Sequence, residues 1–139
     1  PFMIYAGLIQ SWVEREARKC RREPEKRKLY EHKLFRFSRA LAVDMYEQRS
    51  RRGGLYIPHA ELTPFADDHG IELKKIELQS KSLLNRTAAG EYKFSHKSIL
   101  EYFLAEQAFA NAAFRRNFDF EGMDLARDFL REMIREGMS

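Results

Sequence analysis

The chain has 139 residues, of which 44% are hydrophobic and 13% aromatic, with 25 Lys and Arg against 21 Asp and Glu and a single cysteine. A chain of this length can bury roughly two-thirds of its unfolded surface, and Cys20 alone cannot form a disulfide within it. No apolar run approaches the roughly 20 residues that cross a bilayer, so we expect a cytoplasmic, core-forming chain with no membrane partner. Because the sequence begins with Pro1 rather than methionine, we expect it to be a piece of a longer protein.

The positive charge is confined to one region. Residues 15–52 hold 14 basic and 6 acidic side chains, a net charge of +8, whereas the rest of the chain carries a net charge of −4. A solvated helix surface is the simplest interpretation, and nucleic acid or an acidic protein are the other partners that such charge attracts. An adaptor surface for an acidic protein would use the arginines of this region, namely Arg15, Arg18, Arg22, Arg36 and Arg39.

Two long helices are predicted in the first third of the chain. The first ends at Glu23-Pro24, and the second runs from about 25 to 48, up to the Arg- and Gly-rich tract 49–54. The apolar residues at helical spacing are Tyr5, Leu8, Ile9, Trp12 and Val13 in the first helix, and Leu34, Phe37, Leu41 and Met45 in the second, with Leu29 nearby.

Short strands and short helices are predicted in the middle of the chain. Residues 55–57 read as a short strand that Pro58 stops, because proline cannot donate to a sheet ladder. A brief helix over 59–67, a turn at 68–70 and a second helix over about 72–84 follow, with helix-turn-helix proportions. Residues 84–94 then have the alternation and the central glycine of a β-hairpin.

The last third is helical again. Apolar residues recur at helical spacing from Ser98, and Ser98 and Glu101 have the separation of a capping box, which places His96 just outside the helix N-terminus. A closing helix is expected from about 125. The element order predicts a mainly α fold, a winged helix with a small β-hairpin wing and flanking helices. The alternative is an irregular helical bundle with an incidental hairpin.

Motifs for self-sufficient catalysis are missing from the sequence. It contains neither a G-x-x-x-x-G-K-[ST] loop nor a G-x-G-x-x-G after a strand, and nothing near Cys20 supplies a base. His59, Asp67, Asp68 and His69 match no standard zinc or calcium spacing. We therefore expect no catalytic residue and no metal site, and we expect that the chain by itself is not an enzyme and holds no cofactor alone.

The segment 92–105, Y-K-F-S-H-K-S-I-L-E-Y-F-L-A, is rich in specific residues. It resembles the F-x-H-x-S-x-x-E-Y-x-x-A signature near the end of the winged-helix domain in NACHT-type STAND NTPases, the signal-transduction ATPases that include NOD-like receptors and many bacterial proteins. The run 5–16 also resembles that family's helical segment with a W-x-x-R-E-like end, shifted by one residue. The matching residues of the signature are Phe94, His96, Ser98, Glu101, Tyr102 and Ala105.

The resemblance implies a regulatory fragment that follows an absent P-loop core. Residues 1–23 would end a preceding helical region, 24–116 would form the winged-helix domain, and 117–139 would extend toward a following domain. The parent protein would be an NTPase that binds ADP or ATP with Mg²⁺, and the partner of this fragment would be the nucleotide-binding core of the same chain. The resemblance also implies that the parent self-associates on activation.

By the same match, His96 would contact the β-phosphate of ADP and help to hold the inactive state. The amides and dipole of a helix N-terminus favour an anion at that place. The competing interpretation is that His96 only anchors the wing to the following helix. Glu101 is expected to close the cap of that helix, and Tyr102 and Phe103 to pack it against the wing.

The alternative function is DNA binding by the winged helix. Lys74, Lys75 and Lys81 would then enter the major groove, while Arg86 and Lys93 on the wing would meet phosphates. The acidic residues of the same predicted recognition helix, and the position of the basic region in the earlier helices, weigh against this alternative.

Overall fold

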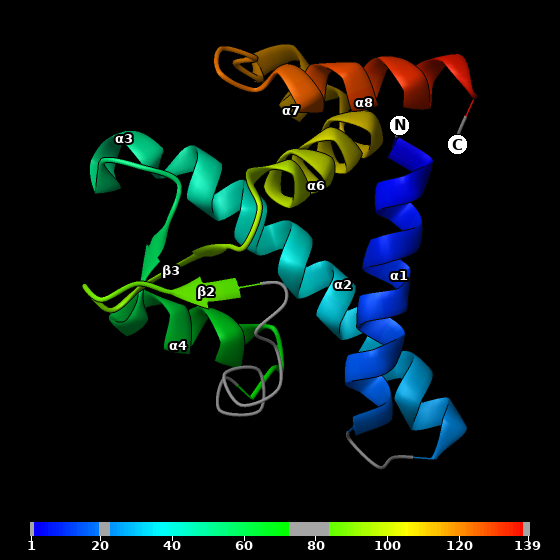
Figure 1. Cartoon of the computed structure of the whole chain (residues 1–139), viewed down its shortest axis with the longest axis vertical. Helices are drawn as coiled ribbons and strands as arrows, with labels where there is room; N and C mark the ends of the chain where they lie inside the picture. The colour runs from blue at the N-terminus through cyan, green and yellow to red at the C-terminus, as the bar shows by residue number, and fades with distance from the viewer. Residues whose placement is uncertain (1, 20–22, 73–83, 138–139) are drawn as a thin grey trace.

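The computed structural model describes residues 2–19, 23–72 and 84–137 and is mainly helical, with one small antiparallel sheet (Figure 1). The helices are α1 (Phe2–Lys19), α2 (Pro24–Glu47), α3 (Arg49–Arg52), α4 (His59–Asp68), α6 (Lys97–Ala110), α7 (Ala112–Asn117) and α8 (Asp124–Arg135). The strands are β1 (Ile57–Pro58), β2 (Leu84–Arg86) and β3 (Glu91–Phe94). Within the described ranges, no helix combines the length and the apolar character needed to span a membrane.

The predicted hairpin wing is confirmed. Strands β2 and β3 pair antiparallel, with Leu84 opposite Phe94 and Arg86 opposite Tyr92. The turn between them needs Gly90, whose φ of 79° lies in the left-handed region that other residues adopt at a cost. The helix predicted over 72–84 falls almost wholly on residues 73–83, outside the described part of the chain.

The first strand lies later than the sequence suggested. We expected residues 55–57, ended by Pro58, but β1 consists of Ile57 and Pro58, and Pro58 lies opposite Glu91 of β3. The sheet order β1-β3-β2 puts β1 at an edge, where a residue without an N–H is tolerated. The amide of His59 then donates to the carbonyl of Gly90 at 3.1 Å, so the pairing continues one residue past the proline.

The two long helices α1 and α2 supply much of the core. The predicted stripe of α2 is confirmed, because Leu34, Phe37, Leu41 and Met45 are each at most 1% exposed. In α1 the prediction is only partly right. Trp12 and its apolar neighbours Ile9 and Val13 are buried, whereas the side chain of Leu8 is 60% exposed.

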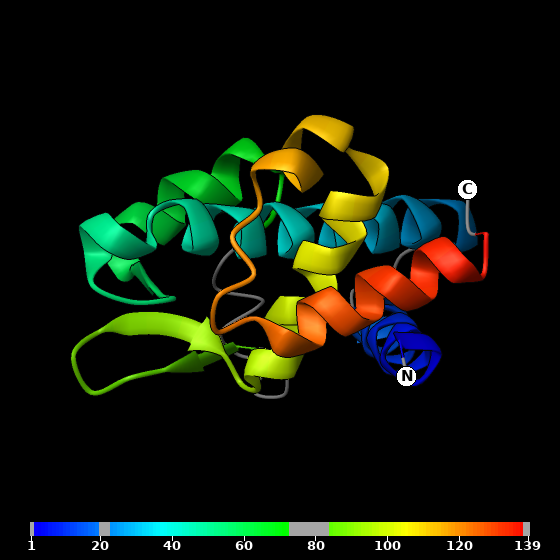
Figure 2. The same cartoon turned by 90° about the horizontal axis from the view of Figure 1, so that it is seen from above.

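Helix α6 lies at the centre of the fold. It packs against α2 on one side and α8 on the other, and α8 crosses the end of the molecule where α1 begins (Figures 1 and 2). The amide of Phe2 donates to Oε2 of Glu132 at 2.8 Å, and the rings of Tyr5 and Phe129 lie 5.1 Å apart. Helix α8 therefore joins the start of α1 to α6, and one continuous hydrophobic cluster runs through all four long helices and the sheet.

Two short helices were not predicted. The tract expected to end the second helix instead forms α3, a single turn that stops at Gly53. Its Arg52 side chain is 4% exposed and pairs with Asp44 at 2.7 Å and Glu61 at 3.2 Å, which fixes the turn between α2 and α4. Helix α7 begins after Asn111, whose side chain accepts the amide of Phe114 at 2.9 Å.

Candidate functional site

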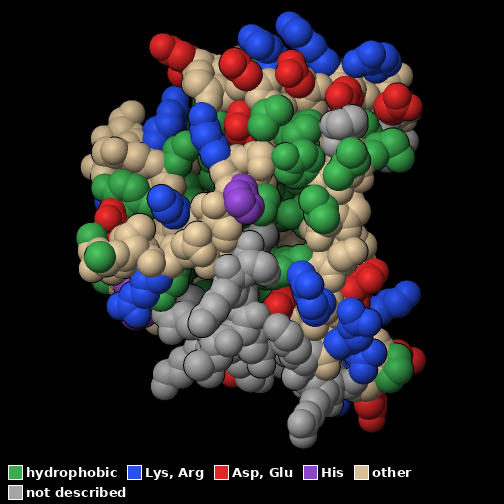
Figure 3. Space-filling model, in the orientation of Figure 1, with side chains coloured by type: hydrophobic (Ala, Val, Ile, Leu, Met, Phe, Trp, Pro, Cys, Tyr) green, Lys and Arg blue, Asp and Glu red, His purple; other side chains and the backbone are tan. Residues whose placement is uncertain are grey.

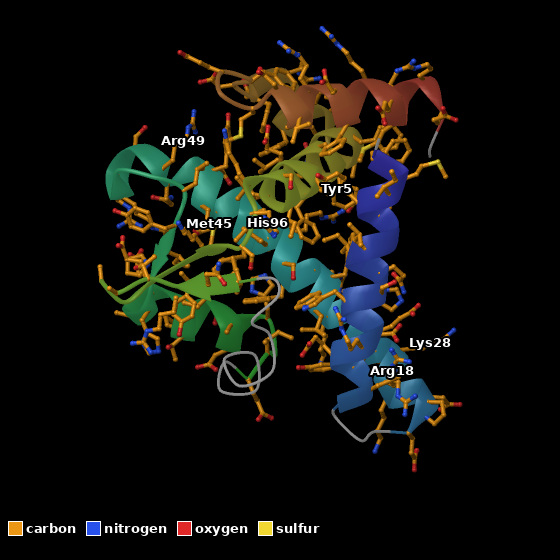
Figure 4. The ribbon with its side chains drawn as sticks, in the orientation of Figure 1. Tyr5, Arg18, Lys28, Met45, Arg49 and His96 are labelled. Carbon is orange, nitrogen blue, oxygen red and sulfur yellow. The ribbon has the colours of Figure 1, made fainter. Side chains whose placement is uncertain are left out.

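His96 occupies the junction between the wing and the central helix. It is the residue before α6, in extended backbone conformation, and its side chain is exposed and makes no capping hydrogen bond to the helix. The buried side chains of Phe94 and Leu100 fix the backbone on both sides of it. Figure 4 shows the imidazole on the near face, between the sheet and α1. The helix N-terminus beside it therefore keeps amides that no side chain caps.

His96 borders a groove between α1 and the start of α6. The groove has a volume of about 620 Å³, and its walls are mostly apolar. In Figure 3, hydrophobic side chains gather on the surface over this part of the molecule. The residues that line the groove are Ile4, Tyr5, Leu8, Ile9, Trp12, Arg15, His96, Ser98 and Ile99.

The groove contains one positively charged side chain, that of Arg15. Arg15 is exposed and forms no ion pair with any described residue, and the described residues that line the groove include no carboxylate. The indole Nε1 of Trp12 is buried and finds no acceptor among the described residues. A ligand that combines apolar surface with an anionic oxygen would match these walls.

No protein-family model, curated protein or solved structure matches this chain.

Glu101 has a different role from the one predicted. We expected it to close the cap of its own helix with Ser98, but α6 begins at Lys97, and its N-terminus has no side-chain cap. The buried carboxylate of Glu101 instead accepts the amides of Leu125 and Ala126 at 3.0 and 3.2 Å. It thus caps α8, for which the preceding residue Met123 provides no side-chain acceptor.

Tyr102 also points toward α8 rather than the wing. Its ring lies edge-on to Phe129 of α8, and its hydroxyl donates to Oε1 of Glu106 at 2.7 Å. Burial raises the pKa of Glu106, against the opposing effects of the Tyr102 hydrogen bond and the nearby Arg39 charge. Burial and the Glu106 carboxylate in turn raise the pKa of Tyr102.

Phe103, in contrast, packs as predicted. Its ring lies 5.9 Å from that of Phe94 on the wing, and it also meets Phe35 of α2 edge-on. The aromatic contacts of Phe103 therefore hold the start of α6 and the His96 junction against the sheet.

The residues proposed for DNA contact are only partly placed. Lys74, Lys75 and Lys81 lie outside the described residues. Arg86 and Lys93 are exposed on neighbouring strands of the wing, and the Arg86 guanidinium lies 5.9 Å from the ring centroid of Tyr92. The wing therefore presents two cations to solvent, one of them braced by an aromatic ring.

The arginines considered as an adaptor surface do not share one groove. Arg15 lines the groove at His96, whereas Arg36 and Arg39 line a separate cleft of about 740 Å³ between α2 and α4. Arg18 lies near Lys28, where the lower ends of α1 and α2 meet (Figure 4). Arg22 is outside the described residues.

The two histidines near α4 make ring contacts, whereas Asp67 and Asp68 are exposed. The ring of His59 lies over Tyr92, and that of His69 stacks on Phe65 at 4.6 Å. Among residues 2–19, 23–72 and 84–137, no group of three or more His, Cys, Asp or Glu is arranged to hold a metal ion.

Sequence reasoning missed the groove itself. Leu8 and Trp12 were assigned together to the core face of the first helix, although Leu8 is exposed at the groove edge. The signal was available, because Ile4, Leu8 and Trp12 repeat every four residues and Arg15 follows one turn later. That stripe is offset from the one formed by Ile9 and Val13.

Proposed function

We propose that this chain is a non-catalytic regulatory winged-helix module of a NACHT-like STAND NTPase, in which it couples the ADP or ATP state of a P-loop core to a conformational switch. The observation that supports this proposal most is the exposed position of His96 at the N-terminus of α6. Its imidazole is exposed at an uncapped helix N-terminus, on a backbone fixed by buried neighbours, at the position that the signature assigns to phosphate contact.

The local physics suits an anion. An imidazole N–H and the first amides of α6 can donate to the same phosphate oxygen, and the helix dipole adds a favourable field. A phosphate held by the absent core at this place would therefore be bound more tightly when the module is docked than when it is released.

The partner in this proposal is the nucleotide-binding core of the same parent chain, with Mg²⁺ and nucleotide bound there, and the released state is the one that self-associates. The present chain supplies the docking surface and the imidazole. Hydrolysis is assigned in this proposal to the core, which would hold the P-loop.

The test uses the parent protein that contains this segment. His96→Ala should lower the amount of ADP that co-purifies and speed its release, because a charge-assisted contact to phosphate is lost. His32→Ala is the matched control, since His32 is exposed on α2 and does not line the groove. Unchanged ADP retention in the His96 variant, or a parent sequence without a P-loop upstream of Pro1, would refute the proposal.

DNA binding remains the second candidate, supported by the exposed pair Arg86 and Lys93 on the wing. In that case affinity for duplex DNA should fall with salt, with a log-log slope of about −0.9 for each phosphate contacted. Reversing both charges to glutamate should then weaken binding and reduce the slope by about 2. Absence of duplex binding at low salt would eliminate this candidate.

A further inference from the structure

We propose that the groove between α1 and the start of α6 is a docking site for an amphipathic helix that carries a carboxylate. This inference concerns a protein partner and goes beyond the nucleotide role proposed for His96. It is based on the α1 wall of the groove, which is formed by Ile4, Leu8, Trp12 and Arg15.

The apolar part of this wall is open to solvent. Ile4 and Leu8 are each 60% exposed. These two side chains lie one turn apart on one helix, next to a groove whose other wall contains Ile99 of α6. A contiguous apolar surface beside a hollow is typical of a binding surface, whereas isolated exposed apolar residues are not.

The polar part of the wall defines the charge of the occupant. Arg15 has no ion-pair partner in the part of the chain that the structure describes, and the groove lining contains no acid. Trp12 is 5% exposed, and its buried indole N–H lacks an acceptor among the described residues. A carboxylate on the occupant would pair with Arg15.

The spacing favours a helix as the occupant. Ile4 to Arg15 spans about 16 Å of α1, which is three turns. A helix laid along this wall would present apolar side chains one turn apart and an acid one turn further, the usual pattern of helix recognition by a groove. A second copy of α1 fits less well, because the stripe that it would present, Ile4, Leu8, Trp12 and Arg15, carries no carboxylate.

The probe is a designed helical peptide of about 14 residues, with an Ala and Gln background, two leucines one turn apart and a glutamate one turn later. Its matched control has lysine in place of the glutamate. Trp12 is the only tryptophan of the chain and lines the groove, so its fluorescence reports occupancy directly. We expect a saturable change in Trp12 emission with the glutamate peptide, and about tenfold weaker binding of the lysine peptide.

Variants of the chain identify the contacts. Arg15→Glu should reverse the preference between the two peptides, and Leu8→Glu should weaken binding of both. Arg18→Glu is the control, because Arg18 is an exposed arginine of α1 that does not line the groove. It should leave the preference unchanged.

Three results would overturn the proposal. The first is no saturable change of Trp12 emission with either peptide, and the second is equal binding of both peptides that Arg15→Glu does not alter. The third is a concentration-dependent dimer, measured by sedimentation, that Leu8→Glu abolishes, since a second copy would then cover the face. Loss of ADP retention in the His96 variant does not depend on any of these outcomes, so failure of the docking site and failure of the nucleotide role are distinguishable.

Discussion

The carboxylate of Glu101 should be one of the larger single contributions to the stability of this chain. It is 4% exposed and accepts two amides at the N-terminus of α8, those of Leu125 and Ala126. Glu101→Ala removes both acceptor contacts and leaves the amide of Ala126 buried without a partner. The change therefore tests whether α8 depends on a side chain that lies 24 residues away in sequence.

The expected loss can be estimated from these contacts. A hydrogen bond to a charged group contributes about 1.5–3 kcal/mol, and the charge also interacts favourably with the α8 dipole by up to about 2 kcal/mol when partly buried. Desolvation of the carboxylate offsets part of this sum. We expect the free energy of unfolding to fall by about 3 kcal/mol in Glu101→Ala and by about 1–2 kcal/mol in Glu101→Gln, which keeps an acceptor oxygen.

Urea unfolding measures this loss, and hydrogen exchange of the Leu125 and Ala126 amides localises it. Asp124→Asn is the control, because Asp124 is an exposed acid in the first turn of the same helix and is replaced without removing a cap. It should change the free energy of unfolding by less than about 1 kcal/mol. If Glu101→Ala were as stable as the parent chain and the two amides kept their protection, the assignment of Glu101 as the α8 cap would be wrong.

Three further predictions concern other parts of the fold. Because burial raises the pKa of Glu106, its ionised form weakens the fold. Glu106→Gln, which keeps an acceptor for Tyr102, should therefore raise the free energy of unfolding at pH 7 by about 1 kcal/mol. In urea titrations the gain should shrink as the pH falls through the raised pKa toward the unfolded value, and a gain independent of pH would contradict this reasoning. Arg52→Met should lower the free energy of unfolding, measured by heat or urea, by about 2 kcal/mol, because it leaves two partly exposed carboxylates without their ion-pair partner. An unchanged free energy of unfolding would show that water fully replaces the lost contacts. Gly90→Ala should destabilise by about 1–2 kcal/mol through its positive φ, whereas Gly7→Ala, inside α1 with open space at the Cβ position, should stabilise by about 1 kcal/mol. Effects of the same sign would refute the backbone argument.

The parts of the fold that the sequence predicted are those controlled by local periodicity. The α2 stripe and the 84–94 hairpin follow from the spacing of apolar residues and from one glycine, and both are confirmed. The short helix α7 was missed although Asn111 caps it, because six residues show too little periodicity to distinguish a helix from a loop.

The errors have a different physical origin, since they depend on contacts between residues distant in the chain. The spacing of Ser98 and Glu101 satisfies the capping-box pattern, yet the carboxylate turns to α8 because that helix has uncapped amides within reach. Leu8 has the spacing of a core residue but lies beyond the area that α2 and α6 cover. Tertiary position decided both cases, although the four-residue repeat of Ile4, Leu8 and Trp12 was a sequence signal for the second.

Two residues of the 94–105 motif, His96 and Glu101, contact different neighbours. His96 faces the groove at the start of α6, whereas Glu101, just over one turn further along, holds the N-terminus of α8. Helix α8 in turn holds the start of α1 through the bond between Phe2 and Glu132, and α1 forms the opposite wall of the groove. A ligand that moved α1 away from α6 would therefore have to carry α8 with it or break one of these two contacts. These two contacts tie α1, α6 and α8 together, so Glu101→Gln, which weakens one of them, should speed hydrogen exchange in α8 before it affects the wing.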